Sequence, residues 1–484
     1  MQMIDLTSAS INFEMIYPEI ALVVAAFVIL LISSSRKLST LAPLIAAGGI
    51  LISFAAAAFQ WGNQVSGFFG MVTCDDFGAA FKLLAAIIAF VSVCIAHRYL
   101  IAKGIDRPEY YALMLFSTMG MMVMANTTDL VVIFLGREIM SVPLYVLAGF
   151  ARRSLESNEA GLKYFFMGAF ASGFLVMGIA FLFGASGTTD LRRLVADFSY
   201  IASNNGIYLT VGAALVLVGF GFKVAAVPFH AWVPDVYQGA PTPVTAFFSA
   251  GPKAAGFAAM LRIFLFGFDQ METLSTTFWI LAVLTMTVGN VLALRQSNVK
   301  RMLAYSSIAH AGYIMVALAV GGPQAISAAV FYLLGYAMFN LGGFAVITLL
   351  ESRTGCKSDF GELAGMSKAN PYLAAILALF MFALSGFPPT VGFFGKFYIF
   401  SAAVKSGFIW LAVLGVMNSF ISVYYYLRVL KVAYFEKTDQ TFAPVTYSPA
   451  IVLALVITAV GTIGLGVWPQ RILEMSQQAL FAFL

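Results

Sequence analysis

The stretch that decides the fold reads Gly219-Phe-Gly-Phe-Lys223-Val-Ala-Ala-Val-Pro228-Phe-His230. It belongs to a long apolar run, yet it carries a lysine and a proline. Pro228 removes one backbone hydrogen-bond donor and crowds the carbonyl four residues earlier, so the stretch predicts a broken helix. Inside a membrane, non-helical backbone is tolerated only where it is buried in protein or lines a wet cavity. The sequence therefore predicts a polar interior around Lys223.

A second stretch has the same character and reads Leu384-Ser-Gly386-Phe-Pro388-Pro389-Thr-Val-Gly392-Phe-Phe-Gly395-Lys396. Two adjacent prolines and three glycines predict a stronger break than the first stretch does. This break also carries a lysine. The chain is thus expected to contain two interrupted helices, each next to a basic side chain.

The composition indicates that both stretches lie in a membrane. Of the 484 residues, 61% are hydrophobic and only 10% are charged, whereas soluble domains average about 25% charged residues. Too little polar material is present to cover the surfaces of several soluble domains, so the apolar excess is expected to face a lipid bilayer. The net charge of +5 suits basic cytoplasmic loops, and no nucleic-acid partner is expected.

The apolar runs predict an all-α integral membrane protein with about fourteen transmembrane helices, since each crossing needs about 20 apolar residues. The candidates are 16–34, 41–60, 77–97, 109–127, 128–150, 160–184, 208–230, 243–267, 276–294, 302–320, 325–350, 372–400, 407–431 and 449–468. Spans 7 and 12 contain the two breaks.

The distribution of basic residues supports the span count and predicts an orientation, because cytoplasmic loops are enriched in lysine and arginine. Loops after even-numbered spans and the tail hold only four such residues, Arg192, Arg193, Lys405 and Arg471. Loops after odd-numbered spans hold sixteen: Arg36, Lys37, Arg98, Lys103, Arg107, Arg152, Arg153, Arg295, Lys300, Arg301, Arg353, Lys357, Lys368, Arg428, Lys431 and Lys437. Both termini are therefore expected on the outer side of the membrane.

The two breaks also predict an internal repeat. Spans 4–8 and spans 9–13 form two runs of five, and the broken helix is the fourth of each run. Because five is odd, the second run starts from the opposite side of the membrane, which is the arrangement of an inverted repeat. We expect four parts: helices 1–3 in 1–108, the first repeat in 109–268, the second, inverted repeat in 269–432, and helix 14 in 433–484.

Several charged residues lie inside the predicted spans, where a charge costs at least about 2.5–3.5 kcal/mol and usually serves function. Glu138, Lys223, Lys253 and Lys396 lie deepest. A lysine and a nearby carboxylate can store or release a proton when the partner moves. The alternative for Glu138 and Lys223 is a structural ion pair that holds two helices together, and for Lys396 a cap on a helix C-terminus.

Other candidates compete more evenly with structural explanations. Lys163 lies near a span start and could snorkel to the interface. His310 is mid-span and could relay protons, or be a hydrogen-bonded core histidine. His230 follows Lys223 by seven residues, the same face of a regular helix, and could form part of a proton entry.

Three further charged residues are not expected to take part in proton transfer. Lys82 and Arg262 lie near span ends and are expected to snorkel. Arg137 is adjacent to Glu138, and because neighbouring helix positions point about 100° apart, it need not pair with that carboxylate; it could face another protein.

No cofactor motif accompanies these residues. Cys74, Cys94 and Cys356 are far apart, which predicts neither a zinc site nor a disulfide, and Cys94 is expected in the core. No phosphate-cradling loop, GxGxxG after a strand, or paired cysteines for an iron–sulfur cluster occur. The titratable residues therefore predict a proton path driven from elsewhere, with no cofactor or metal in this chain.

Several motifs resemble the antiporter-like subunits of respiratory complex I (NADH-quinone oxidoreductase), in the form called subunit N. They are Gly221-Phe-Lys223-Val-Ala-Ala-Val-Pro228-Phe-His230-Ala-Trp232-Val-Pro234-Asp235-Val-Tyr237-Gln238-Gly239-Ala-Pro241-Thr-Pro243-Val, Asn298-Val-Lys300-Arg301-Met-Leu-Ala-Tyr305-Ser-Ser-Ile-Ala-His310, Gly395-Lys396-Phe397-Tyr398 and Tyr424-Tyr-Tyr-Leu-Arg428. The resemblance covers essentially all fourteen spans.

This resemblance implies roles for individual residues. Glu138 matches the glutamate of the fifth helix that modulates the central lysine, and Lys223 matches that lysine. The remaining matches are Lys163 and Lys253 of helices 6 and 8, Lys300 and His310 of helix 10, and Lys396 of helix 12, implicated in the exit. Arg137 departs from the expected pattern, in which an apolar residue is common.

The implied function is proton translocation in the membrane arm, coupled to quinone reduction elsewhere. NAD(H), flavin, iron–sulfur clusters and quinone are then expected in the rest of the complex, with a neighbouring antiporter-like subunit, small membrane subunits and lipid as partners. The implied location is the bacterial inner (cell) membrane, with both termini on the periplasmic side. The alternatives are a subunit of a multisubunit Na⁺/H⁺ antiporter without redox activity, and a structural membrane scaffold.

Overall fold

The computed structural model describes residues 11–35, 37–267, 271–352, 358–437 and 447–481. Cys356 and three of the basic loop residues, Arg36, Arg353 and Lys357, lie outside these ranges. The described chain is almost entirely helical, with one short antiparallel hairpin, β1 (Val65–Gly67) and β2 (Val72–Cys74), between the second and third helices.

The helices follow one another along the chain. They are α1 (Tyr17–Ile32), α2 (Ala42–Phe59), α3 (Asp76–Ala102), α4 (Pro108–Ala125), α5 (Leu130–Ala148), α6 (Leu155–Ser186), α7 (Leu191–Ala196), α8 (Phe198–Val224), α9 (Trp232–Gly239), α10 (Thr242–Arg262), α11 (Glu272–Leu294), α12 (Val299–Val320), α13 (Gly322–Glu351), α14 (Met366–Ala369), α15 (Pro371–Ser385), α16 (Val391–Lys405), α17 (Ile409–Phe435), α18 (Pro449–Val467) and α19 (Pro469–Phe481). Four shorter turns are η1 (Phe13–Ile16), η2 (Ser39–Leu41), η3 (Ile263–Gly267) and η4 (Phe360–Leu363).

The prediction of an all-α membrane fold is confirmed. Each of the fourteen predicted ranges contains a helix or, for 372–400, the pair α15 and α16. Among the described residues, eleven helices are long and apolar enough to cross a membrane. The others are α4, α10 and the α15–α16 pair. Fourteen crossings, the inverted repeat and the four-part division of the chain therefore stay predictions.

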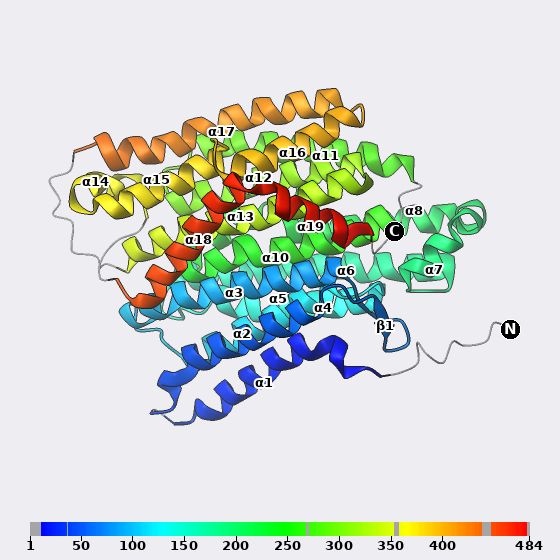
Figure 1. The fold of residues 1–484 in the computed structure, drawn as a ribbon, viewed down its shortest axis with the longest axis horizontal. Coiled ribbons are helices and arrows are strands. Elements are labelled where there is room, and N and C mark those ends of the chain that lie inside the picture. Colours follow the sequence, from blue (N-terminus) through cyan, green and yellow to red (C-terminus); the bar gives the residue numbers. More distant parts are fainter. Residues whose placement is uncertain (1–10, 36, 268–270, 353–357, 438–446, 482–484) are drawn as a thin grey trace.

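The long helices lie side by side, with their ends gathered on two faces (Figure 1). In this view the turn between α1 and α2 lies at the left, and the β1–β2 hairpin lies at the right. Burial is greatest in α12 and α13, where 89% and 94% of the most apolar window is buried, against 33–39% in α2, α6 and α11. The centre of the bundle therefore consists of α12, α13 and the fully buried α10.

Both predicted helix breaks occur. α8 ends at Val224, where Ala225 adopts a left-handed conformation, and helix resumes only at Trp232. α15 ends at Ser385, Gly386 has φ +89°, and α16 starts at Val391. Protein groups satisfy the freed backbone: the N–H of Val227 donates to Thr285 Oγ1 on α11 at 3.0 Å. The chain therefore leaves the helix inside the protein, as membrane-depth backbone requires.

Close packing against the second break gives a test of this arrangement. A Cβ on Gly466 of α18 would lie 2.0 Å from the carbonyl oxygen of Pro389, which is backbone and cannot move aside easily. Two residues earlier, Gly464 has nothing within 4 Å. We expect Gly466→Ala to destabilise the protein by about 1–3 kcal/mol, the usual cost of overpacking.

The matched control is Gly464→Ala, which we expect to be neutral or slightly stabilising because alanine favours helix over glycine by about 1 kcal/mol. The thermal unfolding midpoint in detergent measures both variants. Equal midpoints would contradict the packing of α18 against the α15–α16 break.

Candidate functional site

Lys223 lies in the last turn of α8, immediately before the first break, and its residue is only 3% exposed. Its ammonium group donates hydrogen bonds to Ser141 Oγ on α5 at 2.9 Å and to the hydroxyl of Tyr164 on α6 at 3.0 Å. No carboxylate lies within ion-pair distance of Lys223 among the described residues. Two neutral hydroxyl groups are therefore its polar partners.

Glu138 on α5 is engaged elsewhere. Its Oε1 accepts hydrogen bonds from Arg137 Nη1 and from Ser172 Oγ on α6, the latter at 2.8 Å. The Arg137 side chain is fully buried, so the expectation that it need not pair with Glu138 and could face another protein is wrong. Ser172 also accepts from Arg137 at 2.5 Å, and this shared hydroxyl lets two neighbouring side chains on one helix reach each other.

Glu138 and Lys223 thus do not form the predicted ion pair in this structure. The two sites are nevertheless joined, because Ser141 donates to the carbonyl oxygen of Arg137 at 2.6 Å while it accepts from Lys223. The carboxylate has an arginine partner and the lysine has hydroxyl partners. A shift of Glu138 from Arg137 to Lys223 would exchange one counter-ion for another.

Lys253 and His310 form a second cluster with α12 at its centre. Lys253, 2% exposed on α10, donates to both the carbonyl and the hydroxyl oxygen of Ser307. The hydroxyl of Tyr336 donates to the same Ser307 Oγ at 2.9 Å. Three residues on, His310 contacts tyrosine hydroxyls through both ring nitrogens, Nδ1 at 2.6 Å from Tyr332 and Nε2 at 3.1 Å from Tyr426.

Lys396 forms a third cluster, on α16 after the second break. Its ammonium group donates to the carbonyl oxygens of Leu384 and Ser385 at 3.3 and 3.1 Å, and to Ser419 Oγ on α17 at 2.9 Å. The two carbonyls belong to the last turn of α15, whose dipole favours a cation. Lys396 therefore does cap the broken helix, and it lies after its break whereas Lys223 lies before its own.

The three clusters form one row through the protein. α10 joins the first two, since a Cβ on Gly256, one turn after Lys253, would lie 3.7 Å from Lys223 Cγ. α12 joins the second and third, because the ring of Tyr313 lies 5.6 Å from the ring of His310 and 4.9 Å from Lys396 Nζ. The row thus runs from α8 through α10 and α12 to α16.

Lys163 and His230 lie off this row. The Lys163 side chain is 40% exposed and pairs with Glu159 at 2.6 Å and Asp235 at 2.8 Å. Asp235, outside the membrane spans, also binds Arg301 at 2.7 Å. Burial raises the pKa of Asp235, but the hydrogen bonds from Lys163 and Arg301 outweigh it and hold this pKa below its usual value. His230 lies in the non-helical segment before α9, so it does not share a regular helix face with Lys223.

The expectation that Lys82 and Arg262 snorkel is also wrong. Both side chains are fully buried, and they form ion pairs with Glu19 at 2.9 Å and with Asp75 at 2.7 Å, respectively. Each pair joins helices far apart in sequence, α3 to α1 and α10 to the cap of α3. Lys300 is likewise buried and lies 3.6 Å from Glu351. Cys94 lies in the core as expected.

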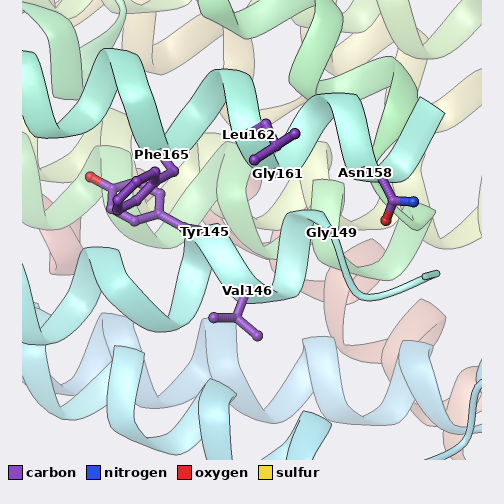
Figure 2. A pocket seen from close by; sticks show the side chains of 7 residues that line it. All are labelled: Tyr145, Val146, Gly149, Asn158, Gly161, Leu162 and Phe165. Carbon is purple, nitrogen blue, oxygen red and sulfur yellow. The ribbon is translucent and has the colours of Figure 1, made fainter. Parts of the chain in front are cut away.

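A groove of about 580 Å³ runs between α5 and α6 beside the Lys223 cluster (Figure 2). Its lining includes Tyr145 and Phe165, whose rings lie 5.8 Å apart edge to face. The Tyr145 ring also packs edge-on against Tyr164, a partner of Lys223. Tyr145 and Tyr164 thus connect the lining of this groove to the lysine.

The aromatic hydroxyls of the row were missed from the sequence. Tyr164, Tyr332, Tyr336 and Tyr426 all contribute hydroxyl groups to the buried clusters. In an apolar span a tyrosine looks like any large hydrophobic residue. The one available signal is position: Tyr164 directly follows Lys163, and Tyr426 belongs to the Tyr424-Tyr-Tyr-Leu-Arg428 motif.

Comparison with known proteins identifies the family. The family described as NADH:quinone oxidoreductase/Mrp antiporter, transmembrane, matches residues 125–422, which hold all three lysine clusters. The chain belongs to this family. NADH-quinone oxidoreductase subunit N of Trichlorobacter lovleyi is 48% identical over 475 residues, 97% of each chain. Subunit N 1 of Solibacter usitatus is 41% identical over 432 residues, 89% of each chain.

Solved structures agree with this membership. A chain of respiratory complex I from Thermus thermophilus matches with a TM-score of 0.80 and 32% identity, over 94% of this chain and 98% of that one. A chain of the archaeal membrane-bound sulfane sulfur reductase matches at 0.88 and 27%, over 97% and 98%. A chain of the Mrp complex from Dietzia matches at 0.82, but at 24% identity that likeness concerns the fold alone.

The Arg137–Glu138 pair gives a test that does not depend on function. Removing one partner of a fully buried ion pair costs about 3–5 kcal/mol, because the other charge is left uncompensated. We expect a smaller loss for Glu138→Gln, since the Glu138 side chain is 28% exposed. The double variant Arg137→Met/Glu138→Gln should recover much of that loss. If the shift of the unfolding midpoint in the double variant equals the sum of the shifts in the two single variants, the ion pair is contradicted.

Proposed function

We propose that this chain is a proton-translocating membrane-arm subunit of an NADH-quinone oxidoreductase. The observation that carries the proposal is the row of buried titratable groups formed by Lys223, Lys253, His310 and Lys396, each hydrogen-bonded to hydroxyl or carbonyl groups of neighbouring helices. Intramembrane ionisable residues that face the interior in this way mark proton or ion pathways. The family and the close relatives named subunit N support the same function.

Lys223 and Lys253 have hydroxyl partners, which tolerate either protonation state. A hydroxyl oxygen accepts a hydrogen bond from an ammonium group and can donate one to a neutral amine. The serine and tyrosine hydroxyls around Lys223 and Lys253 therefore allow a proton to arrive and leave without rebuilding the packing. Lys396 differs, because two backbone carbonyls can only accept, so its charged form is the better bonded one.

Glu138 acts in this proposal as a movable counter-ion for Lys223. With Glu138 on Arg137, Lys223 lacks a carboxylate partner; with Glu138 on Lys223, the ammonium form is stabilised by Coulomb attraction in a low-dielectric site. Motion of one side chain would thus change which lysine in the row holds the proton. Lys163 and His230 would serve the approach to Lys223 from the face where α9 begins.

The two broken helices support the proposed inverted repeat. A further correspondence lies in two isolated β-bridges, Asp129 with Asp190 and Asn298 with Asp359. Asp129 caps the N-terminus of α5 and Asn298 caps that of α12. Each bridge ties the start of the helix that follows α4 or α11 to the chain that precedes a broken helix, as two copies of one unit would.

Redox chemistry would take place in partner subunits. We infer that NAD(H), flavin, iron–sulfur clusters and quinone bind elsewhere in the complex, that a neighbouring antiporter-like subunit and small membrane subunits flank this chain, and that it resides in the bacterial inner membrane with its termini on the periplasmic side. The purified native assembly tests this. Flavin and iron–sulfur absorption support the proposal, whereas their absence favours the Mrp-type antiporter.

Lys223→Ala tests the assignment of the row. We expect proton pumping by the NADH-driven assembly in sealed vesicles to fall at least tenfold, with quinone reduction falling too where the two are coupled, because the row loses its first proton-binding group. Lys405→Ala, an exposed lysine on α16, is the matched control and should pump normally. Undiminished pumping by Lys223→Ala would refute the assignment.

A further inference from the structure

An open pocket of about 1000 Å³ lies where five loops meet at one face of the bundle. Its walls come from the loops after α3, α5, α9, α11 and α13. In the span numbering these are the loops after spans 3, 5, 7, 9 and 11, which belong to the set rich in lysine and arginine. Five of their basic residues line the pocket: Lys103, Arg107, Arg152, Arg153 and Lys300. The positive-inside rule therefore makes this the cytoplasmic face.

Two buried charges line the inner end of the pocket. Lys300, at the start of α12, and Glu351, the last residue of α13, are 5% and 6% exposed and lie 3.6 Å apart. Lys300 also donates to the carbonyl oxygen of Ala240 at 2.9 Å. They are the two buried charged residues of the pocket, whose other charged residues are all exposed.

The carboxylate of Glu351 is held from several helices. Ser358 donates to its Oε1 at 2.5 Å, and Thr242 of α10 donates to its Oε2. Tyr99 of α3 approaches the same Oε2 at 3.5 Å. This carboxylate lines the pocket and lies 3.6 Å from Lys300, so it is in reach both of water in the pocket and of the lysine that would receive its proton.

α12 leads from this pair to the row. Lys300, Ser307 and His310 lie on one face of α12, since intervals of seven and three residues return to the same side of a helix. The step from Lys300 to Ser307 spans about 10 Å along the axis. Ser307 is the residue that binds Lys253. The Tyr237 hydroxyl of α9 also faces Ser307 and lies 3.4 Å from the carbonyl oxygen of Phe248 on α10.

We propose that Glu351, with Lys300, is the proton-loading site of this chain, and that the pocket beside it is the cytoplasmic entrance to the row. This rests on the proposed function and adds an entry that leads to Lys253, besides the approach to Lys223 past Lys163 and His230. A proton leaves water in the pocket and binds the Glu351 carboxylate. Its charge is then neutralised, Lys300 loses its counter-ion, and Lys300 releases a proton along α12 toward Lys253. The ammonium is restored when the Glu351 proton passes to Lys300.

Glu351→Gln tests the loading site, because glutamine has nearly the same size but cannot take up a proton, and one accepting oxygen becomes a donating NH2 group. We expect NADH-driven pumping in sealed vesicles to fall about tenfold, and the deficit to widen as the pH of the pocket side rises, because a scarcer proton must then be captured without a carboxylate. Lys300 and Tyr99 contact Glu351, and the other charged groups that share the pocket with it are Lys103, Arg107, Glu109, Arg152, Arg153, Glu156 and Asp359. Glu351→Asp should restore part of the rate.

The outcomes separate the two proposals. A Glu351→Gln variant that pumps normally at every pH, beside a Lys223→Ala variant that does not pump, would overturn the loading site and leave the proposed function standing. Normal pumping by Lys223→Ala as well would overturn both. A deficit in Glu351→Gln that is independent of pH and unrelieved in Glu351→Asp would mean a purely structural role and would also overturn the loading site.

The entrance is tested by blocking the pocket. Ala151→Cys places a thiol in the pocket lining, and Leu155→Cys places one on a neighbouring side chain that is 85% exposed but outside it. A bulky, membrane-impermeant thiol reagent applied to the cytoplasmic face should reduce pumping severalfold in Ala151→Cys and leave Leu155→Cys unchanged, each compared with the labelled parent protein. Equal effects in the two variants would overturn the entrance.

Discussion

A lysine ammonium inside a membrane protein must find hydrogen-bond acceptors that the lipid cannot supply, and the rest of this structure follows from that constraint. Leaving a charge without partners in a low-dielectric interior costs several kcal/mol after relaxation. The three lysines find different acceptors. Lys223 donates to two hydroxyls, and Lys253 donates to the hydroxyl and the carbonyl of one serine. Lys396 donates to two carbonyls at a helix end and to a serine hydroxyl. Among the described residues, none of the three has a carboxylate partner.

The broken helices are a consequence of the same constraint. The internal carbonyls of an intact helix each accept a hydrogen bond from the helix itself, whereas the last four have no partner within the helix and are free to accept from a side chain. Ending α15 at Ser385 frees the carbonyls that bind Lys396, and ending α8 at Val224 leaves Lys223 in a last turn that α5 and α6 can surround. Proline and glycine thus create polar sites in sequences that are otherwise apolar enough to face lipid.

This explains how much could be predicted from the sequence. Proline, glycine and lysine can be recognised directly in the sequence. Both helix breaks and the buried lysines beside them, Lys223 and Lys396, could therefore be predicted, as could the membrane fold. The partners were not, because serine and tyrosine in apolar helices have no signature of their own: Ser141 and Tyr164 acquire meaning only when α5, α6 and α8 pack together. Lys82 was misread for a related reason, since its partner Glu19 lies two helices away.

Arg137 acts as a permanently charged partner of Glu138. An arginine cannot give up its proton at any physiological pH, so a carboxylate beside it always has a counter-ion. Glu138 therefore does not depend on Lys223, and Lys223 in turn can be neutral without leaving a buried carboxylate unpaired. The fully buried guanidinium thus gives Glu138 a counter-ion other than Lys223, which is what allows the carboxylate to leave the lysine and return to it.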